Sequence, residues 1–158
     1  MFDTRYIATA PMVMPRRLYL SLGDDLTRWP TQVPIDPPFN VVTAFDAHDI
    51  SSDTLGAFAT LLFEQGCVEV CSWGEDCSRV HDCFDEALNQ AEERGSPFDP
   101  GISTEWFARQ PLRDAVLYAV HMAFHEDRDV ESVLVVASTA YADEAASLLE
   151  QPDALWAE

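Results

Sequence analysis

Two stretches of the chain are apolar without interruption and rich in β-branched side chains, and they limit the possible folds more than any other feature. They are FNVVTAF at residues 39–45 and SVLVVAS at residues 132–138. A strand that is apolar on both faces has to be covered on both faces, which is typical of a parallel sheet between two layers of helices. These two strands therefore predict a covered sheet of the α/β class.

Further strand and helix patterns alternate with these two strands. Apolar runs predict three more strands, at residues 16–22, 67–73 and 102–107. Amphipathic patterns predict four helices, within residues 52–65, 77–94, 111–126 and 139–151. With right-handed crossovers, this order predicts a small doubly wound three-layer α/β/α sandwich with a mostly parallel sheet of about five strands.

The length of 158 residues corresponds to a single domain, residues 1–158. Residues 1–16 contain Pro11 and Pro15 and show little periodicity, so they are expected to form an N-terminal arm. In the helix predicted after Pro111, Phe124 falls on the apolar stripe and is expected to face the core.

Ligands of open parallel sheets bind beyond the carboxyl ends of the strands, where the strand order reverses. This rule selects four loops, at residues 46–49, 72–76, 107–110 and 138–141. The second loop opens the stretch CSWGEDCSRVHDCFDEA, which runs from Cys71 to Ala87 and is the densest in polar and aromatic side chains. Trp73, Arg79 and Trp106 are the ligand-binding candidates at this edge.

The same stretch supplies candidates for acid–base and nucleophilic chemistry, namely Asp76, Cys77, His81 and Asp82. In this interpretation Cys77 is a nucleophile and His81 its general base, with Asp85 four residues later to orient the imidazole. The alternative is purely structural: Asp76 caps the helix, His81 lies at the core boundary and the cysteines are buried, as free cysteines commonly are.

Neither a cofactor nor a metal is expected. The chain has no G-x-G, no P-loop motif and no lysine, which disfavours a nucleotide cofactor. The four cysteines lack the C-x2-C spacing of zinc sites. His121 and His125 are four apart on a predicted helix and could reach one metal, but Met122 stands where a metalloprotease helix carries glutamate.

The formal net charge is −19, with nine arginines and no lysine. Such acidity argues against nucleic acid as a partner, because phosphate binding needs a positive surface. It fits either a solvated coat or a basic protein partner. No apolar run approaches a membrane span and no signal peptide is recognisable, so the protein is expected in the cytoplasm. Trp29, Trp106 and Trp156 are candidates for the contact surface of a homo-oligomer.

WGEDCSRVHD, from Trp73 to Asp82, resembles a W-G-x-D-C-x-R-V-H-D signature of an uncharacterised bacterial family, a domain of unknown function. The resemblance extends over about residues 37–150. It implies the α/β fold, and it marks Trp73, Asp76, Cys77, Arg79, His81 and Asp82 as a shared group. The family tends to carry W-H-D-D after the fourth strand, where this chain has Trp106, Phe107, Ala108 and Arg109.

Two functions follow as hypotheses. The first is an acidic binding or regulatory domain, including one of the immunity type, that docks a basic partner. The alternative is a small hydrolase or transferase that uses a cleft around residues 73–82.

Overall fold

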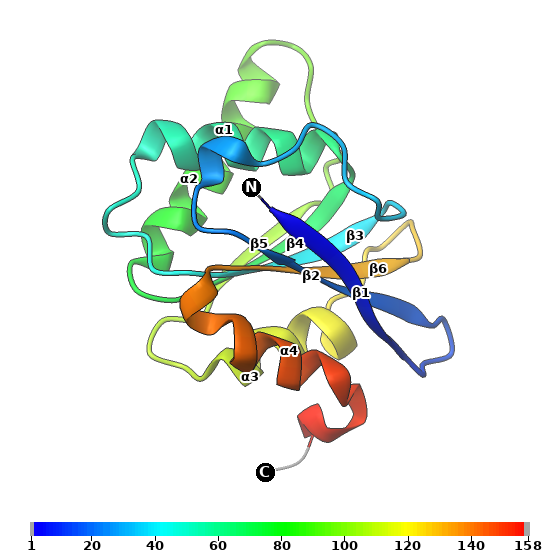
Figure 1. Ribbon diagram of the computed structural model, residues 1–158. Helices are drawn as coiled ribbons and strands as arrows, with labels where there is room; N and C mark the ends of the chain where they lie inside the picture. Colours follow the sequence, from blue (N-terminus) through cyan, green and yellow to red (C-terminus); the bar gives the residue numbers. More distant parts are fainter. Residues whose placement is uncertain (1, 157–158) are drawn as a thin grey trace.

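A computed structural model describes residues 2–156 as a six-stranded sheet with helices on both faces (Figure 1). The order of the strands in the sheet is β1-β2-β6-β3-β4-β5. Only β1 runs antiparallel to its neighbour, and the other five strands are parallel. The strands are β1 (Asp3–Ala10), β2 (Arg16–Leu22), β3 (Phe39–Ala44), β4 (Cys67–Trp73), β5 (Ser103–Trp106) and β6 (Ser132–Ala137).

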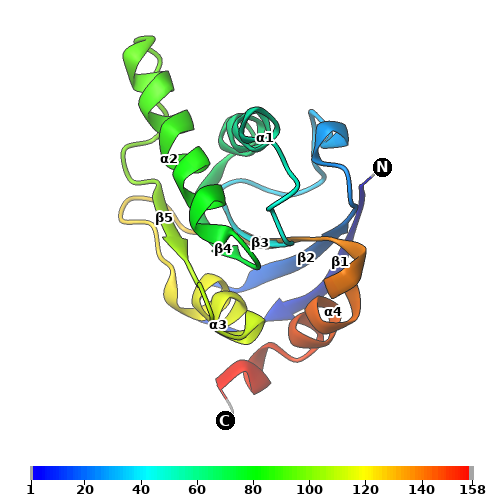
Figure 2. The ribbon, with the colours of Figure 1, turned by 90° about the vertical axis from the view of Figure 1, so that its left-hand side faces the viewer.

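Four α-helices and four short helical segments cover the sheet. The α-helices are α1 (Ser52–Glu64), α2 (Cys77–Glu93), α3 (Leu112–Leu117) and α4 (Ala142–Glu150). The short segments are η1 (Leu26–Arg28), η2 (Tyr118–Met122), η3 (Thr139–Tyr141) and η4 (Pro152–Trp156). Helices α1 and α2 lie on one face of the sheet, and α3 and α4 lie on the other (Figure 2).

The two apolar strands β3 and β6 occupy the middle of the sheet, as their sequences require. Val41 and Leu134 pack into the core beneath α1 and α2, whereas Val42 and Val133 pack into the core beneath α3 and α4. Every residue of both strands is buried. The predicted three-layer α/β/α sandwich is therefore confirmed, with six strands where about five were expected.

The expected N-terminal arm over residues 1–16 is corrected, because Asp3–Ala10 forms β1. This strand pairs with β2 in an antiparallel hairpin whose connection contains Pro11 and Pro15. Because β1 is an edge strand with many exposed side chains, it lacks the apolar pattern that identifies a buried strand.

The helix predicted over residues 111–126 ends early and widens. After α3, segment η2 is a π-helix, in which the Ala123 amide donates to the Tyr118 carbonyl (2.8 Å). Ala123 is extended and ends the helix, so Phe124 turns outward and is 70% exposed rather than buried. The expectation that Phe124 faces the core is therefore wrong.

The end of this helix also separates the two histidines that were expected to lie four apart on one helix. His121 lies within η2 and its Nε2 is 2.9 Å from the Pro152 carbonyl oxygen. His125 lies beyond the helix, and its Nε2 is 3.1 Å from Asp99 Oδ2. The two imidazoles therefore contact different groups.

The expectation that Trp29 belongs to an exposed contact surface is also wrong. It is 4% exposed and lies edge-on between Phe2 and Phe58. Trp106 and Trp156 are exposed, as expected. Among the described residues, no helix combines the length and the apolar character that crossing a membrane demands.

Candidate functional site

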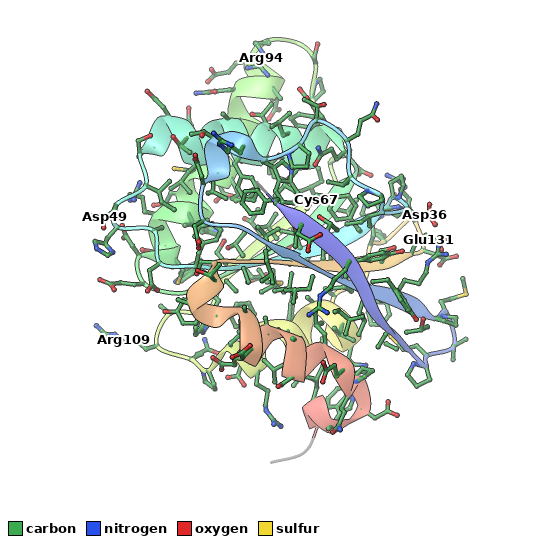
Figure 3. The ribbon with its side chains drawn as sticks, in the orientation of Figure 1. Asp36, Asp49, Cys67, Arg94, Arg109 and Glu131 are labelled. Atoms are coloured by element: carbon green, nitrogen blue, oxygen red, sulfur yellow. The ribbon has the colours of Figure 1, made fainter. Side chains whose placement is uncertain are left out.

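The strand order reverses between β3 and β6, which makes the carboxyl edge of these strands the switch point of the sheet. From β3 the chain passes through α1 to β4 on one side, whereas β6 lies on the other side of β3. The loops that follow β3, β4, β5 and β6 therefore meet at one edge. Asp49 and Arg109, labelled in Figure 3, lie at this edge, opposite Asp36 and Glu131.

These loops enclose an open cleft of about 290 Å³. Each of the four loops selected from the sequence contributes to it. Its lining residues are Asp46, Trp73, Gly74, Glu75, Phe107, Arg109, Gln110 and Tyr141. The cleft therefore combines aromatic surface with two carboxylates and one guanidinium.

Asp46 connects three of the four loops. Its carboxylate accepts hydrogen bonds from the Tyr141 hydroxyl (2.8 Å to each oxygen) and from the Glu75 amide (2.9 Å). Burial, followed by the adjacent Asp46 carboxylate, raises the pKa of Tyr141 to about 12. Tyr141 therefore keeps its proton and remains a hydrogen-bond donor at neutral pH.

Trp73 connects the remaining loop to this network. Its indole Nε1 donates to the Gln110 carbonyl (2.7 Å), and its ring meets Tyr141 edge-on with the centroids 4.8 Å apart. The walls of the cleft are thus held by hydrogen bonds and ring packing before any ligand binds, which lowers the entropy that binding must overcome.

Backbone conformations in the left-handed region concentrate at this edge. Gly74 has φ +114°, and a Cβ built there would lie 2.2 Å from the Phe45 carbonyl oxygen, so only glycine fits. Asp76 and Arg109 are the two non-glycine residues with positive φ among residues 2–156, at 65° and 61°. Such conformations cost energy and cluster at functional sites, which marks this edge independently of the cleft.

Asp76 and Arg79 lie next to the cleft but serve the loop that leads to α1. Arg79 Nε donates to Asp76 Oδ2 (2.8 Å), and its Nη2 donates to the carbonyls of Ala47 and Ile50. The Asp76 carboxylate makes no capping hydrogen bond to α2, so the expected cap is wrong, since Arg79 holds that carboxylate instead. This pair fixes the loop after β3.

Cys77 is the first residue of α2 and is 2% exposed. Burial raises the pKa of its thiol, which disfavours the thiolate that a nucleophilic cysteine requires. Among residues 2–156, no hydrogen bond joins His81 or the other catalytic candidates to this sulfur.

His81 lies at a third location, on the side of α2 that faces the edge strand β5. Its Nε2 is 3.1 Å from Thr104 Oγ1 and 3.6 Å from Asp85 Oδ2, so the expected His81–Asp85 contact is present. Thr104 donates its hydroxyl proton to Asp85 (2.6 Å). Trp106 packs against the imidazole, with the ring centroids 4.5 Å apart and the ring planes inclined by 55°.

On the other side of the ring, His81 Nδ1 is 3.4 Å from Asp82 Oδ1. The hydroxyl, imidazole and carboxylates resemble the parts of a nucleophilic triad. However, the Thr104 hydroxyl donates its proton to the Asp85 carboxylate. His81 therefore donates a hydrogen bond to this hydroxyl and does not act as its general base. The cluster therefore attaches β5 to α2.

The candidates from the sequence are thus divided among the cleft and three other surroundings, and the cleft takes only Trp73 from the ligand-binding set. Sequence reasoning did not single out Asp46, Glu75 or Tyr141, although all three lie in or beside the selected loops. No pattern links Asp46 with Tyr141, which lie 95 residues apart. Their meeting depends on the strand order, which brings β3 beside β6.

Residues 16–152 match a family described as a domain of unknown function (DUF7684). This match agrees with the expected resemblance to an uncharacterised family of domains of unknown function, and it covers all residues that line the cleft. No curated protein and no solved structure matches the chain.

Proposed function

The chain belongs to the DUF7684 family of domains of unknown function, and we propose that within it this protein is a binding module for a basic partner. The observation that carries the proposal is the meeting of two carboxylates, Asp46 and Glu75, with the aromatic pair Trp73 and Tyr141 in one preorganised cleft. The carboxylates outnumber the single guanidinium of the cleft, Arg109.

An arginine or lysine side chain is the ligand that this chemistry favours. A cation gains from carboxylates through charge-assisted hydrogen bonds and from aromatic faces through cation–π attraction. Asp46 is held in place by Tyr141 and the Glu75 amide. The side chain of Glu75 is 66% exposed and lies 3.8 Å from His48 Nδ1, a contact that it can exchange for a cationic ligand. The cleft would therefore receive one cationic side chain of the partner.

The charge of the whole chain supports the same ligand class. A net charge of −19 attracts a basic surface over long distances and repels anions. A small acidic domain that covers a basic surface of its partner is what a regulatory or immunity-type protein requires. Association steered in this way becomes weaker as salt is added, because salt screens exposed charges.

The alternative of a small hydrolase or transferase is less well supported. The four catalytic candidates are divided among three surroundings. Asp76 pairs with Arg79, and the Cys77 thiol is buried. His81 and Asp82 contact each other beside β5. A binding cleft needs only the residues that the structure brings together.

Fluorescence anisotropy with a labelled hexa-arginine peptide tests the proposal. Glu75→Gln is expected to weaken binding by about two- to fivefold, as an exposed ion pair of up to about 1 kcal/mol allows. Glu93→Gln, which removes the same charge at the far end of α2, is the matched control and is expected to change the affinity much less. Equal effects of the two variants would show that the peptide responds to net charge alone and would contradict a site at the cleft.

A further inference from the structure

A second pocket lies at the opposite, amino edge of the parallel strands and has a different chemistry. It has a volume of about 300 Å³ and is enclosed by the β1–β2 hairpin connection and the segment between η2 and β6. Five of its nine lining side chains are apolar, among them Met12, Met14 and Val130. Glu131, which follows Val130, marks this edge in Figure 3.

Arg16 contributes a buried cation to this pocket. The residue is 2% exposed, and its guanidinium donates to the carbonyls of Ala119 (3.1 Å), Val120 (2.9 Å) and Ala123 (2.7 Å) at the end of the π-helix. No carboxylate among residues 2–156 lies within ion-pair distance of it. Three carbonyl dipoles satisfy donors but supply no full negative charge, so a buried positive charge remains without a counter-ion.

The outer side of the Arg16 guanidinium is covered by an exposed aromatic ring. The Phe124 ring lies over the guanidinium, with Arg16 Cζ 4.7 Å from the ring centroid. Phe124 is 70% exposed, and exposed side chains change rotamer rapidly. A ligand can therefore displace the ring from the guanidinium at small cost.

The hairpin connection supplies an apolar wall that nothing in the described chain covers. Val13 is 100% exposed and Met14 is 51% exposed. Exposed apolar side chains grouped around a cavity mark a binding site for an apolar group, and methionine adapts readily to the shape of a ligand. The pocket thus offers the Arg16 guanidinium at its floor and apolar contacts at its mouth. His125, Arg128 and Asp129 complete its lining, so the charges of Arg128 and Asp129 offset each other there.

We propose that this pocket binds a medium-chain carboxylate, with the carboxylate on the Arg16 guanidinium and the alkyl chain against Met12, Met14 and Val130. A cavity of about 300 Å³ lies at the small end of the range for ligand pockets, which suits a small ligand such as octanoate. This site is independent of the cleft for a basic partner, because it lies at the other edge of the sheet and selects the opposite charge.

Titration with octanoate, observed through the methyl NMR signals of Met12 and Met14, tests the proposal. The measurement is made at about 0.15 M salt so that the net negative charge of the protein is screened. Octanol and octylammonium have the same chain without the negative charge. Octanoate is expected to bind at least about tenfold more tightly than either, in keeping with a charge-assisted contact. Equal affinities for octanoate and octanol, or unchanged methyl signals with octanoate, would overturn the proposal.

Two pairs of variants locate the charge. Val13→Glu places a carboxylate at the mouth, and Val13→Gln is its neutral match at a position that is fully exposed and therefore safe for folding. Val13→Glu is expected to weaken octanoate about threefold or more relative to Val13→Gln and to leave octanol unchanged. Identical octanoate affinities of the two variants would contradict an anion site. Arg16→Met is expected to abolish the preference for octanoate over octanol, and the Val13 pair decides the question if that variant does not fold.

Discussion

Replacing Glu69 with glutamine is expected to stabilise the protein above neutral pH and to have little effect in mild acid. Glu69 lies on β4 and is 6% exposed, and its Oε1 has no hydrogen-bond partner among the described residues. Burial, and then the neighbouring carboxylate of Glu105 on β5, raise the pKa of Glu69 to about 7. The folded protein therefore holds this proton more tightly than the unfolded chain.

The magnitude follows from the difference between the two states. The pKa is 4.5 for an unperturbed glutamate and about 7 in the folded protein. At about 1.4 kcal/mol for each pKa unit, the ionised side chain costs the folded state about 3 kcal/mol. This cost is absent below pH 4.5, grows as the pH rises toward 7 and is fully present above it, because the unfolded chain then ionises more easily.

Urea unfolding at about pH 5 and about pH 8.5 measures the effect. The free energy of unfolding of the unmodified protein is expected to fall by about 3 kcal/mol more between these pH values than that of Glu69→Gln, since glutamine cannot ionise. Glu105→Gln is expected to reduce the fall only in part, because burial is the larger cause of the shift. A fall of equal size in the unmodified protein and in Glu69→Gln would refute the reasoning.

Three further predictions concern the carboxyl edge and its supports. Gly74→Ala is expected to destabilise the protein by about 2–4 kcal/mol in urea unfolding, because its Cβ would meet the Phe45 carbonyl; unchanged stability would contradict the left-handed turn. Cys77 is expected to react with iodoacetamide at neutral pH no faster than the unfolding of its surroundings allows, as followed by mass spectrometry, and rapid alkylation would revive the nucleophile hypothesis. Ser51→Ala removes the hydroxyl that caps α1 by accepting a hydrogen bond from the Thr54 amide (3.1 Å). In urea unfolding it is expected to lower the free energy of unfolding by about 1 kcal/mol, whereas Ser51→Asp should retain most of this stability.

Much of the fold could be predicted because the central strands carry their own signal. FNVVTAF and SVLVVAS are apolar on both faces, and this pattern occurs where helices cover both sides of a strand. The edge strand Asp3–Ala10 has no such requirement, and its exposed side chains carry no comparable pattern. The outward orientation of Phe124 could not be predicted either. An apolar stripe assigned with the 3.6-residue period of an α-helix does not account for the wider turn of a π-helix.

The sequence predicted where the site lies but not which residues form it. The parallel strands predicted which edge to examine, and three of the lining residues, Asp46, Glu75 and Tyr141, lie in the loops selected there. Their grouping depends on which strands are neighbours, and local patterns do not contain that information. Density of chemically active residues was a poor guide, since Asp76, Cys77 and His81 lie close in the sequence but serve three different contacts.

The hydrogen bonds of Arg16 depend on the number of residues in the helical segment formed by α3 and η2. The guanidinium meets three carbonyls whose positions depend on the one extra residue that a π-turn accommodates. Deleting a single residue between Tyr118 and Met122 would let the segment wind as a regular α-helix, and at least one of the three carbonyls would leave the position at which it meets the guanidinium. The start of β2 and the end of η2 are thus tied to each other through one side chain.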